Sequence, residues 1–169
     1  MISKKKNKAV FLDRDGTLNK DSGYTYQIEQ LELLPGVVEA LRIFRDAGFL
    51  LIVVTNQSGV GRGYFTEKDV DNFNNALTEE LKKEKINIEK FYMCFHSPED
   101  NCECRKPAPY LINKAIEDFN IDPKKSFLFG DKESDFQSGV NAHVRSLLIT
   151  EEHSLYFWAE KLKRNNFEI

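Results

Sequence analysis

The side chains with the most specific chemistry in this sequence stand close together in its second half. Cys94 and His96 are followed by Cys102 and Cys104, and these are all the cysteines of the chain. Three thiols and one imidazole at this spacing form the ligand set of a tetrahedral zinc site. Three thiols cannot all pair in disulfides, so we expect a reducing compartment that leaves them free for metal. The pattern predicts a zinc-binding loop over residues 94–104 in preference to cysteines scattered through an apolar core.

Two cations, Arg105 and Lys106, follow this loop directly. A loop fastened by metal would hold both side chains in place, and together they would present positive charge to an anion. The alternative interpretation is a pair of ordinary surface charges. Their position right after four candidate metal ligands favours a binding role.

Carboxylates dominate a second group near the start of the chain, in the sequence DRDGT over residues 13–17. Asp13 ends an apolar run, and a turn after it would bring the carboxylates of Asp13 and Asp15 into one cleft. Two carboxylates so close repel each other unless a cation lies between them or one of them holds a proton. Asp131 follows another apolar run and adds a third carboxylate. Oxygen ligands of this kind suit Mg²⁺, so we expect a magnesium site in preference to a solvated turn.

Other polar residues in these segments suit the oxygens of a phosphate. Thr55 offers a hydroxyl, Asn56 offers an amide, and the ammonium groups of Lys106 and Lys132 would balance the negative charge. A carboxylate nucleophile, a divalent cation and cationic side chains are the components of phosphoryl transfer. The sequence therefore predicts an enzyme that acts on a phosphate ester.

The elements that must position these residues alternate between strand and helix along the chain. Short apolar runs rich in β-branched residues predict strands buried on both faces, as in a parallel sheet covered by helices. The predicted strands are residues 9–12, 49–54, 91–95, 126–129 and 146–149. The predicted helices are residues 37–47, 66–85, 107–119, 134–142 and 154–164, with a flexible glycine-rich loop at 59–63.

The polar motifs fall at or just beyond the ends of these predicted strands. Asp13, Thr55, Arg105 and Asp131 all occupy such positions. Open α/β sheets bind their ligands along the edge formed by the carboxyl ends of the strands. We therefore expect these residues to meet in one cleft.

Length and composition fit one globular domain over residues 1–169. Hydrophobic residues make up 41% and charged residues 30%, which is typical of globular chains. The formal net charge of −3 shows no basic excess, so neither nucleic acid nor an anionic membrane is expected as a partner. Lysines 4–6 are expected to form a solvated tail, and the apolar run after them is too short for a signal peptide. We expect a soluble, cytoplasmic monomer.

Four of these motifs together resemble those of the haloacid dehalogenase-like phosphatases. They are DRDGT after the first strand, TN after the second, the lysine of RKP, and GDKESD after the fourth. The resemblance covers residues 9–150 and implies a three-layer, Rossmann-like α/β fold with a parallel sheet flanked by helices. The segments 17–35 and 55–106 are too short for the cap domain that larger members insert there. The zinc loop and the glycine-rich loop are therefore expected to shape the cleft.

The resemblance also implies a role for each matching residue. Asp13 would attack phosphorus and become an aspartyl phosphate, while Asp15 would protonate the leaving oxygen and later activate water. Thr55 and Lys106 would bind the transferred phosphoryl group, and Asp135 would orient Lys132 or a metal-bound water. Mg²⁺ would be held by the Asp13 carboxylate, the Asp15 carbonyl and Asp131, and Zn²⁺ by Cys94, His96, Cys102 and Cys104. The substrate would be contacted by Asp21, Ser22, Gly23, Tyr24, Asn56, Gln57, Ser58, Arg105 and Lys132.

Within the family, the motifs are most similar to the branch that removes the 7-phosphate of D-glycero-D-manno-heptose 1,7-bisphosphate. This phosphorylated sugar belongs to the synthesis of ADP-heptose and of the lipopolysaccharide core. Gly23, Tyr24 and Lys132 favour that branch.

Two alternatives stay open on the sequence. The histidinol-phosphate phosphatases of histidine biosynthesis share the zinc loop, and the short segment of residues 97–101 between the zinc ligands points toward them. A catalytically silent zinc-binding scaffold is the other alternative. Such a protein would be expected to lack Asp13, Asp15 or Lys106, and all three are present.

Overall fold

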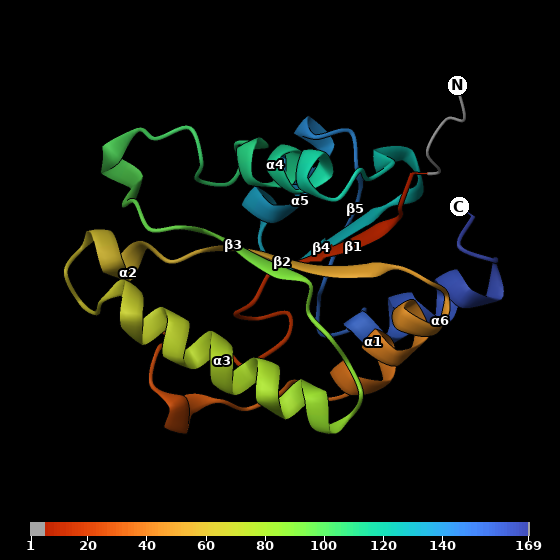
Figure 1. The fold of residues 1–169 in the computed structure, drawn as a ribbon, viewed down its shortest axis with the longest axis horizontal. Coiled ribbons are helices and arrows are strands. Elements are labelled where there is room, and N and C mark those ends of the chain that lie inside the picture. The colour runs from red at the N-terminus through yellow and green to blue at the C-terminus, as the bar shows by residue number, and fades with distance from the viewer. Residues whose placement is uncertain (1–5, 169) are drawn as a thin grey trace.

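The computed structural model describes residues 6–168 and has three layers, with a parallel sheet in the middle (Figure 1). The strand order is β3-β2-β1-β4-β5, and every neighbouring pair is parallel. The strands are β1 (Ala9–Leu12), β2 (Leu50–Asn56), β3 (Lys90–Cys94), β4 (Phe127–Gly130) and β5 (Arg145–Leu148). The predicted parallel α/β sheet is confirmed. Of the predicted lysine tail, residues 4 and 5 lie outside the described part.

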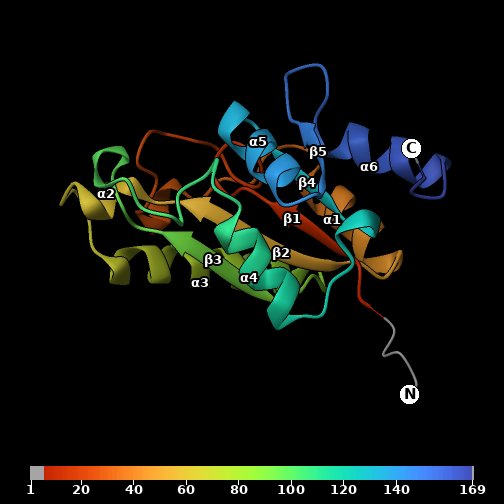
Figure 2. The ribbon, with the colours of Figure 1, turned by 90° about the horizontal axis from the view of Figure 1, so that it is seen from above.

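Helices cover both faces of the sheet (Figures 1 and 2). One face carries α1 (Val37–Asp46), α3 (Glu67–Lys83) and α6 (Leu155–Arg164), and the other carries α4 (Tyr110–Asp118) and α5 (Glu133–Asn141). The short helix α2 (Ser58–Gly61) and three 3₁₀ turns, at 28–30, 98–100 and 123–125, belong to the connections. No helix within residues 6–168 has the length and apolar character needed to cross a membrane.

The central strand β1 shows why the strands read as unbroken apolar runs. Val10 and Leu12 belong to the core formed with α1, α3 and α6, while Ala9 and Phe11 belong to the core formed with α4. All four side chains are fully buried. Because both faces of the strand pack against helices, neither set of alternating positions can be polar.

Helix α4 begins later than predicted. Pro107 and Pro109 hold the chain in a turn, which the N–H of Ala108 closes by donating to the carbonyl of Arg105 at 2.9 Å. The helix therefore starts only at Tyr110 instead of at residue 107.

The glycine-rich segment is also more ordered than a flexible loop. The N–H of Arg62 donates to the carbonyl of Ser58 at 3.0 Å and closes the single turn of α2. Helix α3 then begins after Thr66, as predicted. Thr66 accepts from the N–H of Asp69, and the Asp69 carboxylate accepts from the N–H of Thr66.

Candidate active site

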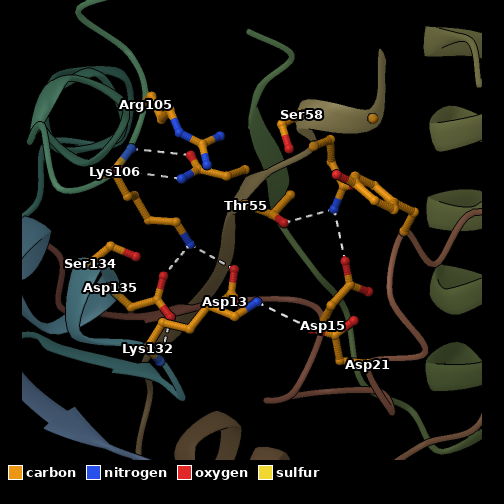
Figure 3. A pocket seen from close by; sticks show the side chains of 14 residues that line it. Asp13, Asp15, Asp21, Thr55, Ser58, Arg105, Lys106, Lys132, Ser134 and Asp135 are labelled. Atoms are coloured by element: carbon orange, nitrogen blue, oxygen red, sulfur yellow. Dashed lines mark hydrogen bonds and ion pairs between the residues drawn. The ribbon is translucent and has the colours of Figure 1, made fainter. Parts of the chain in front are cut away.

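A polar cavity of about 170 Å³ lies at the edge where the carboxyl ends of the strands meet (Figure 3). Its walls combine the segments after β1, β2 and β4 with the segment after the predicted zinc loop. The lining residues are Asp13, Asp15, Asp21, Tyr24, Thr55, Asn56, Gln57, Ser58, Gly59, Arg105, Lys106, Lys132, Ser134 and Asp135. The structure thus brings most of the predicted site residues to one place.

A buried ion-pair cluster forms the most strongly charged part of this cavity. Lys106 Nζ lies 2.6 Å from an oxygen of Asp13 and 2.6 Å from an oxygen of Asp135. It also donates to the carbonyl of Val54 at 2.8 Å. The side chains of all three charged residues are at most 8% exposed. Three acceptors therefore fix the ammonium group, as a buried charge requires.

The two central groups of this cluster have perturbed pKa values. Burial raises the pKa of Asp13 to about 7, and the neighbouring Lys106 charge only partly opposes this change. For Lys106, burial alone would lower the pKa, but the carboxylates of Asp13 and Asp135 outweigh it and raise the pKa. A poorly solvated carboxylate beside a permanently charged ammonium group is a candidate nucleophile for an anionic substrate.

Asp131 completes a group of three carboxylates that fits a divalent cation. Ligand atoms of Asp13, Asp131 and Asp135 lie within 4.8 Å of one another. Burial raises the pKa of Asp131, and its Oδ1 is buried without a hydrogen-bond partner among residues 6–168. An orphaned carboxylate oxygen in such a group suits Mg²⁺, which prefers oxygen ligands. Gly16 permits this arrangement, because with φ at +84° it brings the turn so close that a Cβ would collide with the Asp131 carboxylate.

The carboxylate of Asp15 is held by several donors. It accepts from Gln57 Nε2 at 2.9 Å and from Asn19 Nδ2 at 2.9 Å. The Nε and Nη2 atoms of Arg14 donate to its two oxygens at 3.0 and 2.8 Å. The side chain therefore has a fixed orientation at the wall of the cavity.

The end of β2 supplies a second wall. Thr55 is buried, and its hydroxyl oxygen accepts from Gln57 Nε2 at 3.0 Å. The side-chain amide of Asn56 pairs with the backbone of Lys106, since Oδ1 accepts from its N–H at 3.1 Å and Nδ2 donates to its carbonyl at 3.3 Å. Asn56, predicted as a substrate contact, thus also positions the lysine.

The rim of the cavity carries Asp21, Tyr24 and Lys132. Lys132 Nζ lies 3.2 Å from an Asp21 oxygen, and Tyr24 is 45% exposed. Among the described residues, Ser22 and Gly23 do not line the cavity. They form the turn between Asp21 and Tyr24, in which the Gly23 N–H donates to Asp21 Oδ1 at 2.9 Å.

The four predicted zinc ligands also converge. The Sγ atom of Cys102 lies 3.6 Å from that of Cys94 and 3.7 Å from that of Cys104, and the Sγ atoms of Cys94 and Cys104 are 2.9 Å apart. His96 Nδ1 lies 3.3 Å from Cys104 Sγ. A tetrahedral zinc with Zn–S bonds of about 2.3 Å needs thiolates about 3.8 Å apart. The two distances from Cys102 match this spacing, and the Cys94–Cys104 pair would have to move apart to bind zinc. The chemistry of the four donors, which gather within 4.8 Å of one another, suits this metal. Arg105 Nη1 donates to the carbonyl of His96 at 3.4 Å, which ties this cation to the loop.

Sequence reasoning missed several features of the site, among them Gly59 in the cavity wall. Ser134 lines the cavity, and Asp135 pairs directly with Lys106 in addition to accepting from the backbone N–H of Lys132 at 3.1 Å. Arg14 is fully buried behind Asp15. The position of Arg14 between two site aspartates was the available signal for its role.

The three-layer fold and the polar cavity can now be compared with those of known protein families. The family model of the haloacid dehalogenase-like hydrolases matches residues 19–143, which is most of the chain. The chain belongs to this family of hydrolases.

Two similar relatives are both heptose-1,7-bisphosphate 7-phosphatases. The D-glycero-beta-D-manno-heptose-1,7-bisphosphate 7-phosphatase of Helicobacter pylori strain J99 is 45% identical over 150 residues, covering 88% of this chain and 86% of the relative. The D-glycero-alpha-D-manno-heptose-1,7-bisphosphate 7-phosphatase of Campylobacter jejuni is 42% identical over 147 residues, covering 87% and 84%.

A solved structure is similar over nearly the whole length. It is the D,D-heptose 1,7-bisphosphate phosphatase from B. bronchiseptica in complex with magnesium and phosphate. The TM-score is 0.83 at 25% sequence identity, covering 94% of this chain and 99% of that chain.

Proposed function

We propose that this chain removes the 7-phosphate of D-glycero-D-manno-heptose 1,7-bisphosphate, as in the synthesis of ADP-heptose and the lipopolysaccharide core. The observation that carries the proposal is the buried cluster in which Lys106 lies 2.6 Å from both Asp13 and Asp135. It combines a poorly solvated nucleophile with a fixed cation at a cavity open to a phosphate ester. The names of the similar relatives support the choice of sugar.

The first half of the reaction uses Asp13 and Asp15. An oxygen of the Asp13 carboxylate forms a bond to phosphorus, and the bond from phosphorus to the sugar oxygen breaks. Asp15 gives its proton to that oxygen, so the sugar leaves as an alcohol. Lys106 and the Thr55 hydroxyl bind the phosphoryl oxygens and stabilise their charge in the transition state.

The second half regenerates the enzyme. Asp15, now a carboxylate, takes a proton from water, and the water oxygen attacks the phosphorus of the aspartyl phosphate. The bond between phosphorus and the Asp13 oxygen breaks, which releases inorganic phosphate and returns Asp13 to a carboxylate. Asp15 ends the cycle protonated and ready for the next substrate.

Two metal sites belong to this proposal. Asp13 and Asp131, with the Asp15 carbonyl, would hold Mg²⁺, which when bound neutralises charge on phosphoryl oxygens. Asp135 is close enough to join them, but its ion pair with Lys106 assigns it to the lysine. Four protein ligands in the zinc loop leave no open position for substrate, so the zinc would be structural. The zinc would order the loop that ends at Arg105.

Groups at the rim suit the rest of a sugar bisphosphate. Arg105 offers a planar fork of donors, and Lys132 a compact charge, and both line the cavity beyond the ion-pair cluster. Asp21 can accept from sugar hydroxyls once its contact with Lys132 opens. A substrate with a second phosphate and several hydroxyls would use all three side chains.

A side-by-side turnover assay tests this proposal. Phosphate release in Mg²⁺ buffer would be measured on the alpha and beta anomers of heptose 1,7-bisphosphate and on histidinol phosphate. We expect one heptose anomer to exceed histidinol phosphate in kcat/KM by at least about 100-fold, because unpaired polar groups penalise the poorer match. Phosphorus NMR of the product should show the 1-phosphate retained. Faster turnover of histidinol phosphate would overturn the assignment.

A further inference from the structure

We propose that Arg14 and Asn74 form a positioning pair that holds the Asp15 carboxylate in the orientation needed for proton transfer. This inference rests on the proposed function, because it concerns the acid of the same reaction. Arg14 does not line the cavity among the described residues, so it acts through Asp15 and not on the substrate.

Arg14 is a buried cation whose donors are directed at specific partners. Its side chain has no exposed surface, and its guanidinium lies 4.4 Å from the centre of the Phe73 ring. Nε and Nη2 form a two-pronged contact with the Asp15 carboxylate at 3.0 and 2.8 Å. Because the guanidinium is planar and rigid, this contact sets the plane of the carboxylate as well as its position.

Asn74 fixes the other side of the guanidinium. It belongs to α3, is 4% exposed, and accepts from Arg14 Nη1 through Oδ1 at 3.0 Å. Its Nδ2 faces the sulfur of Met93 at 3.2 Å. Without Asn74, Nη1 would be buried without this acceptor, and the guanidinium would be free to tilt against the Phe73 ring.

The same guanidinium joins the acid to the substrate rim. Nη2 also donates to the carbonyl of Thr25 at 2.5 Å. Thr25 directly follows the turn that carries Asp21 and Tyr24 on the cavity rim. Arg14 therefore connects three parts of the molecule: helix α3, the acid Asp15 and the rim segment.

The chemistry of the leaving group provides a selective test. A sugar oxygen must receive a proton as it leaves, whereas nitrophenolate leaves readily without one. We would compare the wild type with Asn74→Ala, which keeps the Arg14 side chain but removes the acceptor of its Nη1. The readout is the first turnover after rapid mixing, with heptose bisphosphate and with p-nitrophenyl phosphate, so that hydrolysis of the phosphoenzyme does not limit the signal.

We expect Asn74→Ala to slow the first turnover of the sugar phosphate roughly 10- to 100-fold, since small misplacements of catalytic groups have such effects. The first turnover of the nitrophenyl ester should change less than about twofold, because this step does not use the acid. Asn74→Asp keeps an oxygen opposite Arg14 and should restore most of the sugar-phosphate rate.

A matched control separates positioning from general destabilisation. Leu81→Ala truncates a fully buried side chain on the same helix, and it removes no hydrogen bond to Arg14. Melting temperatures of all variants would be measured together. Equal slowing of both substrates by Asn74→Ala, or the same pattern in Leu81→Ala, would overturn the proposal.

The two proposals fail in different ways. If the wild type hydrolyses another alkyl phosphate but no heptose bisphosphate, the substrate assignment is wrong. The comparison of that alkyl ester with the nitrophenyl ester then still decides the role of Asn74. A loss confined to the alkyl ester would support the positioning pair, and an equal loss on both would overturn it.

Discussion

At the scale of single residues, burial explains much of the chemistry. Asp13 and Lys106 lie together where both charges are poorly solvated, and Asp135 supplies a second negative charge to the lysine. The electrostatic field at the cavity is therefore set by the fold before any substrate arrives. This arrangement avoids the cost of reorienting water during the reaction.

Replacement of the proposed nucleophile, Asp13, gives a direct test. Asp13→Asn keeps the shape of the side chain but removes its attacking oxygen charge, so kcat should fall by at least about 10⁴-fold. The fold should persist, because Lys106 keeps its ion pair with Asp135. Steady-state phosphate release and circular dichroism would check both parts. Near-normal turnover of this variant would refute the aspartyl-phosphate mechanism.

Substitution of the neighbouring cations Arg105 and Lys106 should change the kinetics in different ways. Lys106→Ala should lower kcat about 100- to 1000-fold on every substrate, because it removes stabilisation of the phosphoryl group in the transition state. Arg105→Ala should raise KM for the heptose bisphosphate while hardly affecting a simple aryl phosphate. Kinetics of both variants on both substrates would check this. An equal loss from Arg105→Ala on the two substrates would place Arg105 in the catalytic machinery instead.

At the scale of elements, the predicted zinc loop and the glycine-rich segment form one unit. The N–H of Gly61 donates to the carbonyl of Phe95 at 2.9 Å, and a Cβ at Gly61 would lie 2.7 Å from that oxygen. Arg62 pairs with Glu99 at 3.3 Å. Disorder in either segment should therefore reach the other, and through it the mouth of the cavity.

Metal content tests this coupling. Protein purified without chelator should contain roughly one zinc per chain, with Zn–S distances of about 2.3 Å by X-ray absorption. Removal of zinc, or Cys102→Ser, should raise KM more than it lowers kcat, since the loop orders Arg105. Activity should continue to require Mg²⁺. If zinc alone restored full activity to metal-free enzyme, the assignment of a structural role to zinc and a catalytic role to Mg²⁺ would be contradicted.

A second contact between elements gives a pH prediction. The Asp118 carboxylate, at the end of α4, accepts from the Tyr92 hydroxyl at 2.7 Å and from Lys90 of β3 at 3.1 Å. These bonds lower the pKa of Asp118 to about 2. A carboxyl whose pKa is lowered in the fold stabilises it above its ordinary pKa and loses this effect as pH falls toward about 2. Urea unfolding should show Asp118→Asn less stable than wild type at pH 7, with the difference shrinking below about pH 4. A difference that stays constant down to pH 3 would argue against this account.

The elements were largely predictable from the sequence because apolar runs of strand length end at polar site residues. Asp13 and Asp131 mark the ends of the neighbouring strands β1 and β4 in both the prediction and the structure. The start of α4 was harder to predict, because the apolar periodicity of a helix does not show that the chain first forms a turn at Pro107 and Pro109.

The partners within the site were harder to predict, because they depend on packing across the whole sheet. The ion pair of Lys106 with Asp135 joins the segment after the zinc loop to the first turn of α5. Arg14 and Asn74 are 60 positions apart, and arginine is seldom fully buried. Such a contact becomes visible only when α3 has been placed against the turn after β1.

At the scale of the whole molecule, the strand order places β1 in the middle and leaves β3 and β5 at the edges. β1 bonds to β2 on one side and β4 on the other, and its four side chains are fully buried. Two neighbours and two helical layers protect this strand more than an edge strand can be protected.

Hydrogen exchange should reveal this difference in local stability between the middle strand and the edge strands. Amides of β1 should exchange only through global unfolding, whereas amides of β5 should exchange faster through local opening. Mass spectrometry of peptides covering residues 9–12 and 145–148 would check the order. Equal or faster exchange in β1 would mean that the centre of the sheet is not the most stable part.

The position of β1 also has a consequence for the chain as it is synthesised. The N–H of Ala9 donates to the hydroxyl of Ser126 across 117 positions of sequence, and β4 follows directly. A chain emerging from the ribosome can pair β1 with β2 long before β4 exists, so one edge of the most apolar strand stays open during most of translation. Unpaired strand edges of this kind are general sites for pairing with other chains. The last third of the chain therefore supplies β4, which closes this edge, and it also supplies Asp131 and Asp135 of the charged cluster.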